Sequence, residues 1–140
     1  MNDRFFLDTN VLVYTFDPRQ PLKQQRALEL VTEALQGRGI ISFQVVQEFL
    51  NVASRRFVQP FSAADCRDYL DTVLEPLCEI FPTMDLYRRA VELMERRKYG
   101  LFDSLVIASA LDGGCRTLYS EDLHDGQVIE GLTISNPFEA

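Results

Sequence analysis

The sequence predicts an α/β fold, a parallel sheet with helices on both faces. Short apolar runs of strand length alternate along the chain with longer stretches whose apolar residues recur at helical spacing. Strands that alternate with helices imply right-handed crossovers, which make the strands parallel and leave helices on either side of them. With 140 residues, of which 46% are apolar, the chain is expected to fold as one domain with a sizeable core.

The first half of the chain is expected to form two strands and three helices. These are a strand at 4–7, a short helix that starts near Asn10, a helix at 20–36 after a break at 17–21, a strand at 39–42 and a helix at 43–55. Apolar residues recur at helical spacing in 20–36, and Gly37 and Gly39 follow directly. Glycine after such a stretch is typical of a helix end.

Three helices and three strands are expected in the second half. They are a helix at 63–74 that Ser62 caps and that ends near Pro76, a strand at 79–81, helices at 84–98 and 103–111, and strands at 116–119 and 132–135. Serine is favoured at a helix N-terminus, whereas proline restricts the residue before it to extended conformations. Gly113 and Gly114 are expected to stop the helix at 103–111.

Composition argues against several classes of protein. No apolar run is longer than four residues, far below the roughly 20 that a membrane helix needs. The start, MNDRFFLD, has no apolar signal region, so a cytoplasmic protein without membrane contact is expected. Cys66, Cys78 and Cys115 lie far apart and are interpreted as small buried residues, not as a zinc site or a disulfide framework. His124 is the only histidine, which disfavours catalysis by a histidine base.

The net charge of −7 argues against simple electrostatic binding to nucleic acid. One arrangement removes this objection. If several acidic side chains converge on a bound metal, the cation inverts the local potential.

Four acidic residues stand where an α/β sheet would bring them together. Asp8 and Asp122 follow strands, and the carboxyl ends of the strands are where open α/β sheets bind ligands. Asp103 opens a helix, and Glu48 lies at the rim of the apolar arc of the helix at 43–55. Taken singly, Asp8 and Asp103 also fit helix caps, Asp122 a turn and Glu48 a surface position.

Four carboxylates that lie close together are suited to binding a divalent metal ion. Carboxylates that converge raise each other's pKa, a penalty that a divalent cation removes. Oxygen ligands suit Mg²⁺ or Mn²⁺, and one or two such ions can activate water and stabilise the leaving oxygen of a phosphodiester. The polar neighbours Thr9, Asn10 and Ser120 are expected to orient the ligands or the water.

Four motifs carry a family resemblance. They are LDTNVLVY, ISFQVVQEF, GLFDSLVIASAL and LYSEDLHDGQVIEGLTISNPF, and in this order they span the chain from end to end. On these motifs the sequence resembles the PIN-domain ribonucleases, and more closely the VapC toxins of bacterial type II toxin–antitoxin pairs. The resemblance implies a single PIN-like nuclease domain over residues 1–140, with a parallel sheet of about four to five strands.

The resemblance also assigns roles to residues of this chain. It maps the catalytic and metal-binding acids to Asp8, Glu48, Asp103 and Asp122. Its polar helper maps to Ser120, with Thr9 and Asn10 as further candidates. Glu121 stands next to Asp122, but the position of Asp122 after the strand fits the motif better.

An activity and partners follow from the same resemblance. It implies an endoribonuclease dependent on Mg²⁺ or Mn²⁺ that hydrolyses RNA phosphodiester bonds and leaves 5′-phosphate and 3′-hydroxyl ends. As a toxin it would inhibit translation until a small VapB-like antitoxin binds, and it would form a homodimer. Promoter DNA would be contacted only through the antitoxin, and transfer RNA is one target that the resemblance suggests.

Substrate contacts and alternatives complete the sequence-based hypotheses. Arg55 and Arg56 are candidates for contacts with the RNA backbone, while Phe57 and Phe61 either stack on bases or serve core or dimer packing. Two other functions stay open: a non-catalytic PIN-like module that only holds a partner, and a PIN nuclease that processes RNA outside a toxin pair. A receiver or phosphatase domain is disfavoured, because no lysine follows a late strand and residue 10 is Asn where a phosphatase would have a second Asp.

Overall fold

A computed structural model describes residues 3–139 of the chain. The strands are β1 (Phe5–Leu7), β2 (Gly39–Ser42), β3 (Cys78–Ile80), β4 (Thr117–Tyr119), β5 (Val128–Ile129) and β6 (Leu132–Ser135). The helices are α1 (Thr9–Tyr14), α2 (Pro21–Glu33), α3 (Phe43–Arg55), α4 (Ala63–Tyr69), α5 (Glu75–Leu77), α6 (Met84–Arg97) and α7 (Leu101–Asp112). Two wider, π-type turns extend α2 and α4, η1 (Ala34–Arg38) and η2 (Leu70–Leu74).

The strands form one sheet in the order β3-β2-β1-β4-β6-β5. All neighbours are parallel except β5, which is antiparallel to β6. From the central strand β1 the chain first builds β2 and β3 on one side and later β4 on the other. The carboxyl end of β1 is therefore the point where the strand order reverses, the usual ligand site of such sheets.

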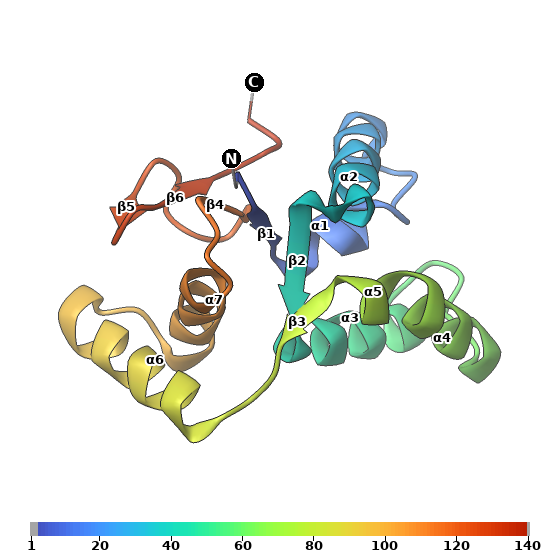
Figure 1. Cartoon of the computed structure of the whole chain (residues 1–140). Helices are drawn as coiled ribbons and strands as arrows, with labels where there is room; N and C mark the ends of the chain where they lie inside the picture. Colours follow the sequence, from blue (N-terminus) through green and yellow to red (C-terminus); the bar gives the residue numbers. More distant parts are fainter. Residues whose placement is uncertain (1–2, 140) are drawn as a thin grey trace.

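The helices lie on both sides of this sheet, as Figure 1 shows. There α1 and α2 lie to the right of β1 and β2, while α6 and α7 pack together on the left. Helix α3 begins directly after β2 and crosses the lower end of the sheet toward α4. The predicted fold class, an α/β domain with a mostly parallel sheet and helices on both faces, is confirmed.

The sheet has six strands, more than the four to five expected, because sequence reasoning missed β5. This strand forms a hairpin with β6 through Glu130 and Gly131, whose φ values are 51° and 88°. Two residues with positive φ make the turn type that matches the twist of a two-residue hairpin. A strand of two residues is too short to show any periodicity in the sequence.

The expected start of the helix at 103–111 was wrong, while two other helices end close to where they were expected to end. Helix α7 begins at Leu101 with Gly100 as its N-cap, so Asp103 lies inside the first turn and does not cap the helix. The helical stretch after Ser62 continues through η2 into α5 and ends at Leu77, directly after Pro76. The helix at 20–36 gives way to the π-type turn η1, in which Gly37 has a φ of 100°.

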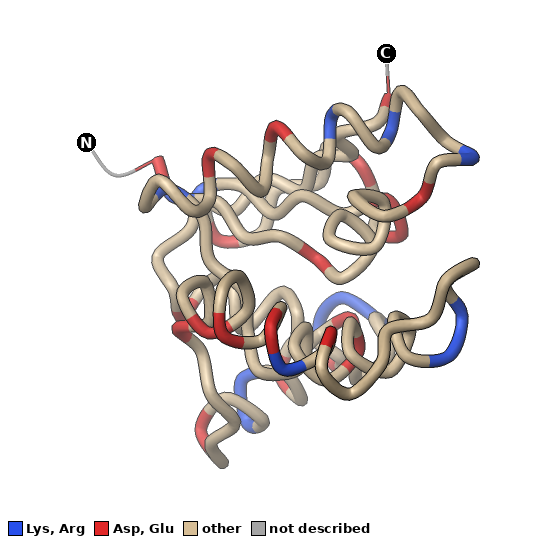
Figure 2. Tube along the Cα trace, turned by 90° about the vertical axis from the view of Figure 1, so that its right-hand side faces the viewer, with Lys and Arg blue, Asp and Glu red and all other residues tan. Residues whose placement is uncertain are grey.

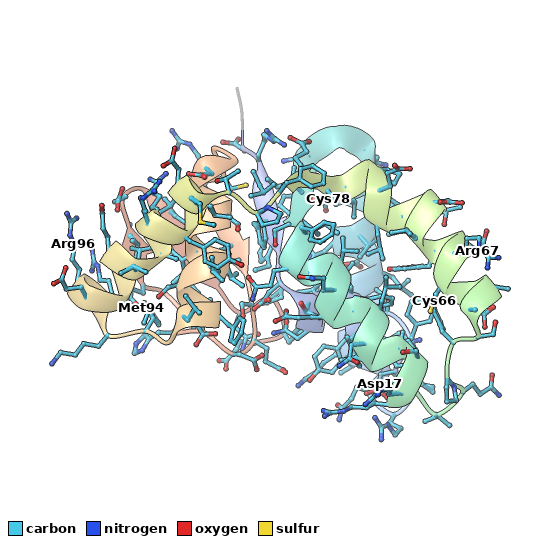
Figure 3. The ribbon with its side chains drawn as sticks, turned by 90° about the horizontal axis from the view of Figure 1, so that it is seen from below. Asp17, Cys66, Arg67, Cys78, Met94 and Arg96 are labelled. Atoms are coloured by element: carbon cyan, nitrogen blue, oxygen red, sulfur yellow. The ribbon has the colours of Figure 1, made fainter. Side chains whose placement is uncertain are left out.

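A single apolar core fills the space between the sheet and its helices, and its largest fully buried side chains include Phe6, Phe49 and Ile107. Cys115 is buried as expected. Cys66 and Cys78 are only partly covered, which corrects their interpretation as buried residues, because α4 and the edge strand β3 both lie at the surface (Figure 3). Within residues 3–139, none of the helices combines the length and the apolar character that crossing a membrane requires.

Charge is unevenly distributed over the chain. Figure 2 shows acidic residues spread over most of the trace, whereas Lys and Arg gather in a few short stretches. The net charge is −7. Because the basic residues are confined to these stretches, a group of acids elsewhere on the trace has few cations near it to neutralise its charge.

Candidate active site

Asp8 combines the two roles that its sequence position allowed. It directly follows β1, and its backbone N–H donates to the carbonyl oxygen of Tyr119 in β4 at 3.0 Å. Its Oδ1 accepts from the N–H of Thr9 at 2.8 Å, so Asp8 is also the N-cap of α1. The residue is only 9% exposed. Capping fixes the orientation of a buried carboxylate at the switch point of the sheet.

Ser120 brings the end of β4 to the same carboxylate. Its hydroxyl donates to Asp8 Oδ2 at 2.7 Å and accepts from the backbone N–H of Asp122 at 3.2 Å. The contact follows from the parallel pairing of β1 with β4, in which Leu7 is opposite Tyr119. The next residues of the two strands are then neighbours. Ser120 is fully buried, so this hydrogen bond is shielded from water.

Glu48 reaches the site from α3, at the partly buried rim that its helical position predicted. The hydroxyl of Thr9 donates to Glu48 Oε1 at 2.6 Å, and the side-chain amide of Gln44 donates to Oε2 at 3.2 Å. The same amide is 3.3 Å from the carbonyl oxygen of Phe102, so Gln44 ties α3 to the start of α7. Sequence reasoning missed Gln44, although its place one helical turn before Glu48 was a usable signal.

Asp122 and Asp103 complete the group from the exposed side. The side-chain amide of Asn10 donates to Asp122 Oδ2 at 3.0 Å. Asn10 Oδ1 accepts from the backbone N–H of Glu121 at 3.4 Å. Asp103 is exposed in the first turn of α7. The structure thus brings the four acids to one edge of the sheet, together with Thr9, Asn10 and Ser120.

The electrostatics of the group reflect this proximity. Burial raises the pKa of Asp8 to about 6, and the charges of Glu48 and Asp122 act in the same direction, against hydrogen bonds from Ser120 and Thr9. The pKa of Asp103 is also raised, first by desolvation and then by the charges of Asp122 and Glu48. Burial is the larger cause of both shifts, and repulsion between the neighbouring carboxylates adds to it.

Neutral groups are the hydrogen-bond partners of these acids. Within residues 3–139, none of Asp8, Glu48, Asp103 and Asp122 forms an ion pair with Lys, Arg or His. Two buried polar atoms have no hydrogen-bond partner among the described residues, and each belongs to a residue close in sequence to one of the acids. They are Oε1 of Gln44, one helical turn before Glu48, and Oγ of Ser104, directly after Asp103. Orphaned polar atoms of this kind are expected where a ligand or water binds.

The acids are neighbours without forming a closed cage. In the part of the chain that the structure describes, no three Asp, Glu, His or Cys side chains are arranged so that they could hold one metal ion together. The physical reason is visible in the contacts, since Asp8, Glu48 and Asp122 each turn toward a different neutral donor. The chemistry of the donor set, oxygen-only and uncompensated, still fits Mg²⁺ or Mn²⁺.

Comparison with known proteins decides the family. The family model described as "PIN domain" matches residues 5–124, which include every acid of the site. The chain belongs to the PIN domain family. No curated protein matches the sequence.

Solved structures agree with this PIN fold. A toxin–antitoxin complex from Klebsiella pneumoniae aligns with a TM-score of 0.67 at 22% identity, covering 96% of this chain and 98% of the other. VapC20 from Mycobacterium tuberculosis, a toxin that cleaves the sarcin–ricin loop, aligns with a TM-score of 0.58 at 21% identity over 84% and 89% of the chains. VapBC2 from Rickettsia felis, bound to a DNA fragment of its promoter, aligns with a TM-score of 0.63 at 21% identity, covering 94% of this chain and 97% of the other. At these identities the likeness is one of fold.

The expected substrate contacts of the PIN domain lie away from the acids. Arg55 and Arg56 are exposed at the end of α3, roughly 10 Å along the helix axis from Glu48. Phe57 and Phe61 are half-buried in an aromatic cluster with Phe16, at ring distances of 5.4 and 5.2 Å. The structure therefore places these two rings in side-chain packing, the more usual of their two expected roles.

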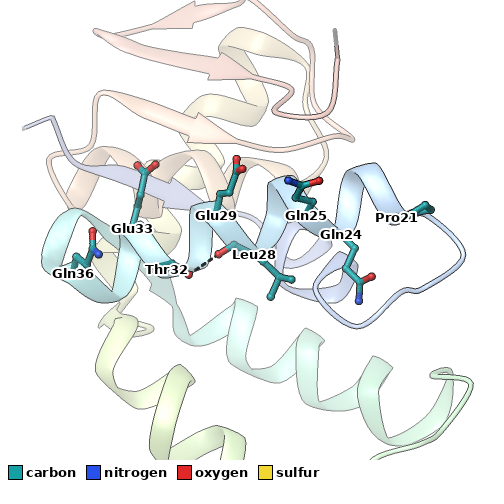
Figure 4. A pocket seen from close by; sticks show the side chains of 8 residues that line it. All are labelled: Pro21, Gln24, Gln25, Leu28, Glu29, Thr32, Glu33 and Gln36. Carbon is teal, nitrogen blue, oxygen red and sulfur yellow. Dashed lines mark hydrogen bonds between the residues drawn. The ribbon is translucent and has the colours of Figure 1, made fainter.

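A hollow on α2 of the PIN domain lies apart from the acids. Figure 4 shows a shallow groove along α2, lined by residues such as Gln25, Leu28 and Glu29, in which the hydroxyl of Thr32 donates to the carbonyl oxygen of Leu28 at 2.8 Å. In Figure 3 the end of α6 with Arg96 projects on the left, and α4 with Arg67 lies on the right. The elements that carry the acids lie between these two ends.

Proposed function

We propose that this PIN domain is a divalent-metal-dependent endoribonuclease and the toxin of a toxin–antitoxin pair that inhibits translation until its antitoxin binds. The observation that carries the proposal is the uncompensated acid group. Asp8 is buried with a raised pKa beside further carboxylates, and no basic side chain among the described residues neutralises them. Ionisation of a carboxylate group of this kind costs free energy in the folded protein, and a bound cation offsets that cost.

The residues of the site divide into ligands and orienting groups. Asp8, Glu48, Asp103 and Asp122 would hold one or two Mg²⁺ or Mn²⁺ ions. When bound, such an ion supplies Lewis-acid chemistry to a water molecule and to the leaving oxygen of a phosphodiester. The chain's own task is orientation, in which Thr9, Asn10, Gln44 and Ser120 fix the carboxylates through the hydrogen bonds given above.

RNA is held by other parts of the surface, because chemistry at a phosphodiester does not depend on base sequence. Arg55 and Arg56 form no ion pair with any described residue and are free to contact phosphates. Replacing both with Gln is expected to raise the KM for RNA several-fold and to flatten the salt dependence of binding, with kcat unchanged. An unchanged salt dependence would remove them from the interface.

Partners follow from the same proposal. The solved toxin–antitoxin complexes of similar fold support an antitoxin as a partner of this chain. We expect a VapB-like antitoxin that brings Arg or Lys to the acidic group and carries any contact with promoter DNA. A complex with only apolar antitoxin side chains near Asp8 and Asp103 would contradict this. The exposed apolar side chains of Met84, Tyr87 and Val91 on α6 offer a surface for the homodimer, which a monomeric mass in solution would exclude.

The proposed nuclease domain takes in residues 1–140. The family model ends at residue 124, but β5 and β6 lie beyond it and complete the sheet. Strand β6 pairs with β4, the strand that delivers Ser120 and Asp122. Removal of the last strands would leave β4 as an unpaired edge.

The experiment that tests the proposal is cleavage of an RNA panel, including transfer RNA and ribosomal RNA, by the purified protein. We expect cleavage with Mg²⁺ or Mn²⁺, no cleavage in EDTA, and full recovery when metal is added back. The products should carry 5′-phosphate and 3′-hydroxyl ends, which end-labelling detects. Equal cleavage in EDTA would contradict metal dependence, and no cleavage of any RNA would favour a module that only binds a partner.

A further inference from the structure

A side-chain cluster next to the acidic group takes no part in the function proposed above. Its members are Glu121, which stands between Ser120 and Asp122, Tyr14 of α1 and Lys23 of α2. Lys23 Nζ lies 2.5 Å from Glu121 Oε2, and the hydroxyl of Tyr14 donates to Glu121 Oε1 at 2.6 Å. Lys23 Nζ also lies 3.3 Å from the Tyr14 hydroxyl oxygen, so each member contacts the other two. We call these three residues the Lys23 cluster.

The Lys23 cluster is more enclosed than an ordinary surface ion pair. The side chains of Lys23 and Glu121 are 33% and 25% exposed. Lys23 Nζ lies 4.9 Å from the centroid of the Tyr14 ring, and this ring packs edge-on against Phe138 at 4.8 Å. Exposed ion pairs contribute little because their long side chains must be ordered, but here packing has already ordered them.

The cluster acts on the chain segment that serves the acids. Within three consecutive residues, Ser120 donates to Asp8, Glu121 enters the cluster and Asp122 accepts from Asn10. Asn10 and Tyr14 are four residues apart on α1, so one face of this short helix contacts both acids of the segment. Glu121 is thereby directed away from the acidic group, and its neighbour Asp122 is directed toward it.

We propose that the Lys23 cluster is a positioning element that holds residues 120–122 against α1 and α2, so that Ser120 and Asp122 face Asp8. Lys23, Tyr14 and Glu121 are positioning residues, since they act through the backbone of this segment. The effect on catalysis rests on the proposed function, whereas the effect on the segment itself does not. The pKa of Lys23 is raised by its hydrogen bonds to Glu121 and then to Tyr14.

Substitutions in the Lys23 cluster separate positioning from simple electrostatics by the sign of their effect. Loss of a positive charge near a cation site strengthens metal binding by Coulomb's law, so a purely electrostatic role predicts tighter Mn²⁺ binding by Lys23→Met. Positioning predicts the opposite, a loss of roughly 10-fold in Mn²⁺ affinity. The double variant Lys23→Met/Glu121→Gln restores the charge balance. Electrostatics predicts wild-type affinity for it, while positioning predicts a defect no larger than that of either single variant.

The matched control is Arg26→Met, on the same helix. Among the described residues, Arg26 forms an ion pair only with Glu29, at 3.3 Å. This substitution removes the same charge without touching residues 120–122. We expect its Mn²⁺ affinity, kcat and KM to stay at wild-type values. Lys23→Arg, which keeps the charge and can reach Glu121, is expected to recover most of the affinity that Lys23→Met loses.

Three measurements test the proposal. Titration with Mn²⁺ gives the affinities, and RNA cleavage should show kcat reduced roughly 10-fold by Lys23→Met with an unchanged KM. Amide hydrogen exchange should be faster at residues 120–123 in Lys23→Met and unchanged in Arg26→Met. Unchanged exchange in this segment, or tighter Mn²⁺ binding by Lys23→Met, would overturn the proposal. If the wild type binds no Mn²⁺ and cleaves no RNA, the nuclease function fails, and hydrogen exchange alone still decides whether the cluster holds the segment.

Discussion

Asp8→Asn is expected to lower the rate of RNA cleavage by on the order of 10²–10³-fold, the largest effect of any single substitution in this chain. Asp8 is the one acid of the group that is buried, and its two oxygens are oriented by Thr9 and Ser120. An amide keeps the size of the side chain and can still accept from Thr9. It removes the negative charge that a divalent ion needs at the centre of the group.

The control for this loss is Asp85→Asn, measured in the same cleavage assay. Asp85 lies in the first turn of α6 with its side chain 93% exposed, and it pairs only with Arg88. The substitution makes the same chemical change on a different helix. We expect wild-type rates from it. If Asp8→Asn and the wild type cleave RNA at equal rates, the observed activity comes from another site of the protein or from a contaminating enzyme.

The same Asp8→Asn substitution is expected to stabilise the metal-free fold at neutral pH by about 2–3 kcal/mol. Burial raises the pKa of Asp8 from its ordinary value of 3.8 to about 6. The folded protein therefore binds this proton more tightly than the unfolded chain does. The free energy of unfolding is highest below pH 3.8 as far as this group is concerned, and it falls as the pH rises toward 6. Above that pH the whole penalty is present, and Asn does not incur it.

Thermal or urea unfolding in EDTA between pH 4.5 and 8 measures this difference. The stability of the wild type should decline relative to the variant across the window and run parallel to it above about pH 7. Saturating Mg²⁺ or Mn²⁺ should then stabilise the wild type more than the variant, since the variant has lost one of the four carboxylates that would hold the ion. A variant that is less stable than the wild type at pH 8 in EDTA would show that the hydrogen bonds of Asp8 outweigh its burial.

Local signals explain why so much of the fold was predictable. Helix α3 has the predicted bounds because Ser42 caps it with a hydrogen bond to Val45 and because its apolar residues follow a helical period. Strands β2 and β6 also lie where they were expected, since each is a short apolar run beside a glycine. Asp8 and Ser120 could be placed at one edge because parallel strands end at the same side of a sheet.

The remaining features depend on contacts between distant parts of the chain. Nothing local marks the bond from Gln44 to the carbonyl oxygen of Phe102, because that acceptor is a backbone atom 58 residues away. Strand β5 exists only because β6 is beside it. The start of α7 at Leu101 was missed because its N-cap is Gly100, which makes no side-chain hydrogen bond and gives a weak sequence signal.

The pairing of β1 with β4 ties the acidic site to the order in which the chain is synthesised. Asp8 is synthesised before Ser120, its hydrogen-bond partner, which follows 112 positions later. A polypeptide that stops short of β4 has neither Ser120 nor Asp122, and its β1 lacks a neighbour on one side. Because a domain folds as a unit, a nascent chain that has not reached Asp122, or one that terminates before it, lacks the complete group of acids. Assembly of the site is therefore a late event in the production of each molecule, separated in time from the synthesis of its first ligand.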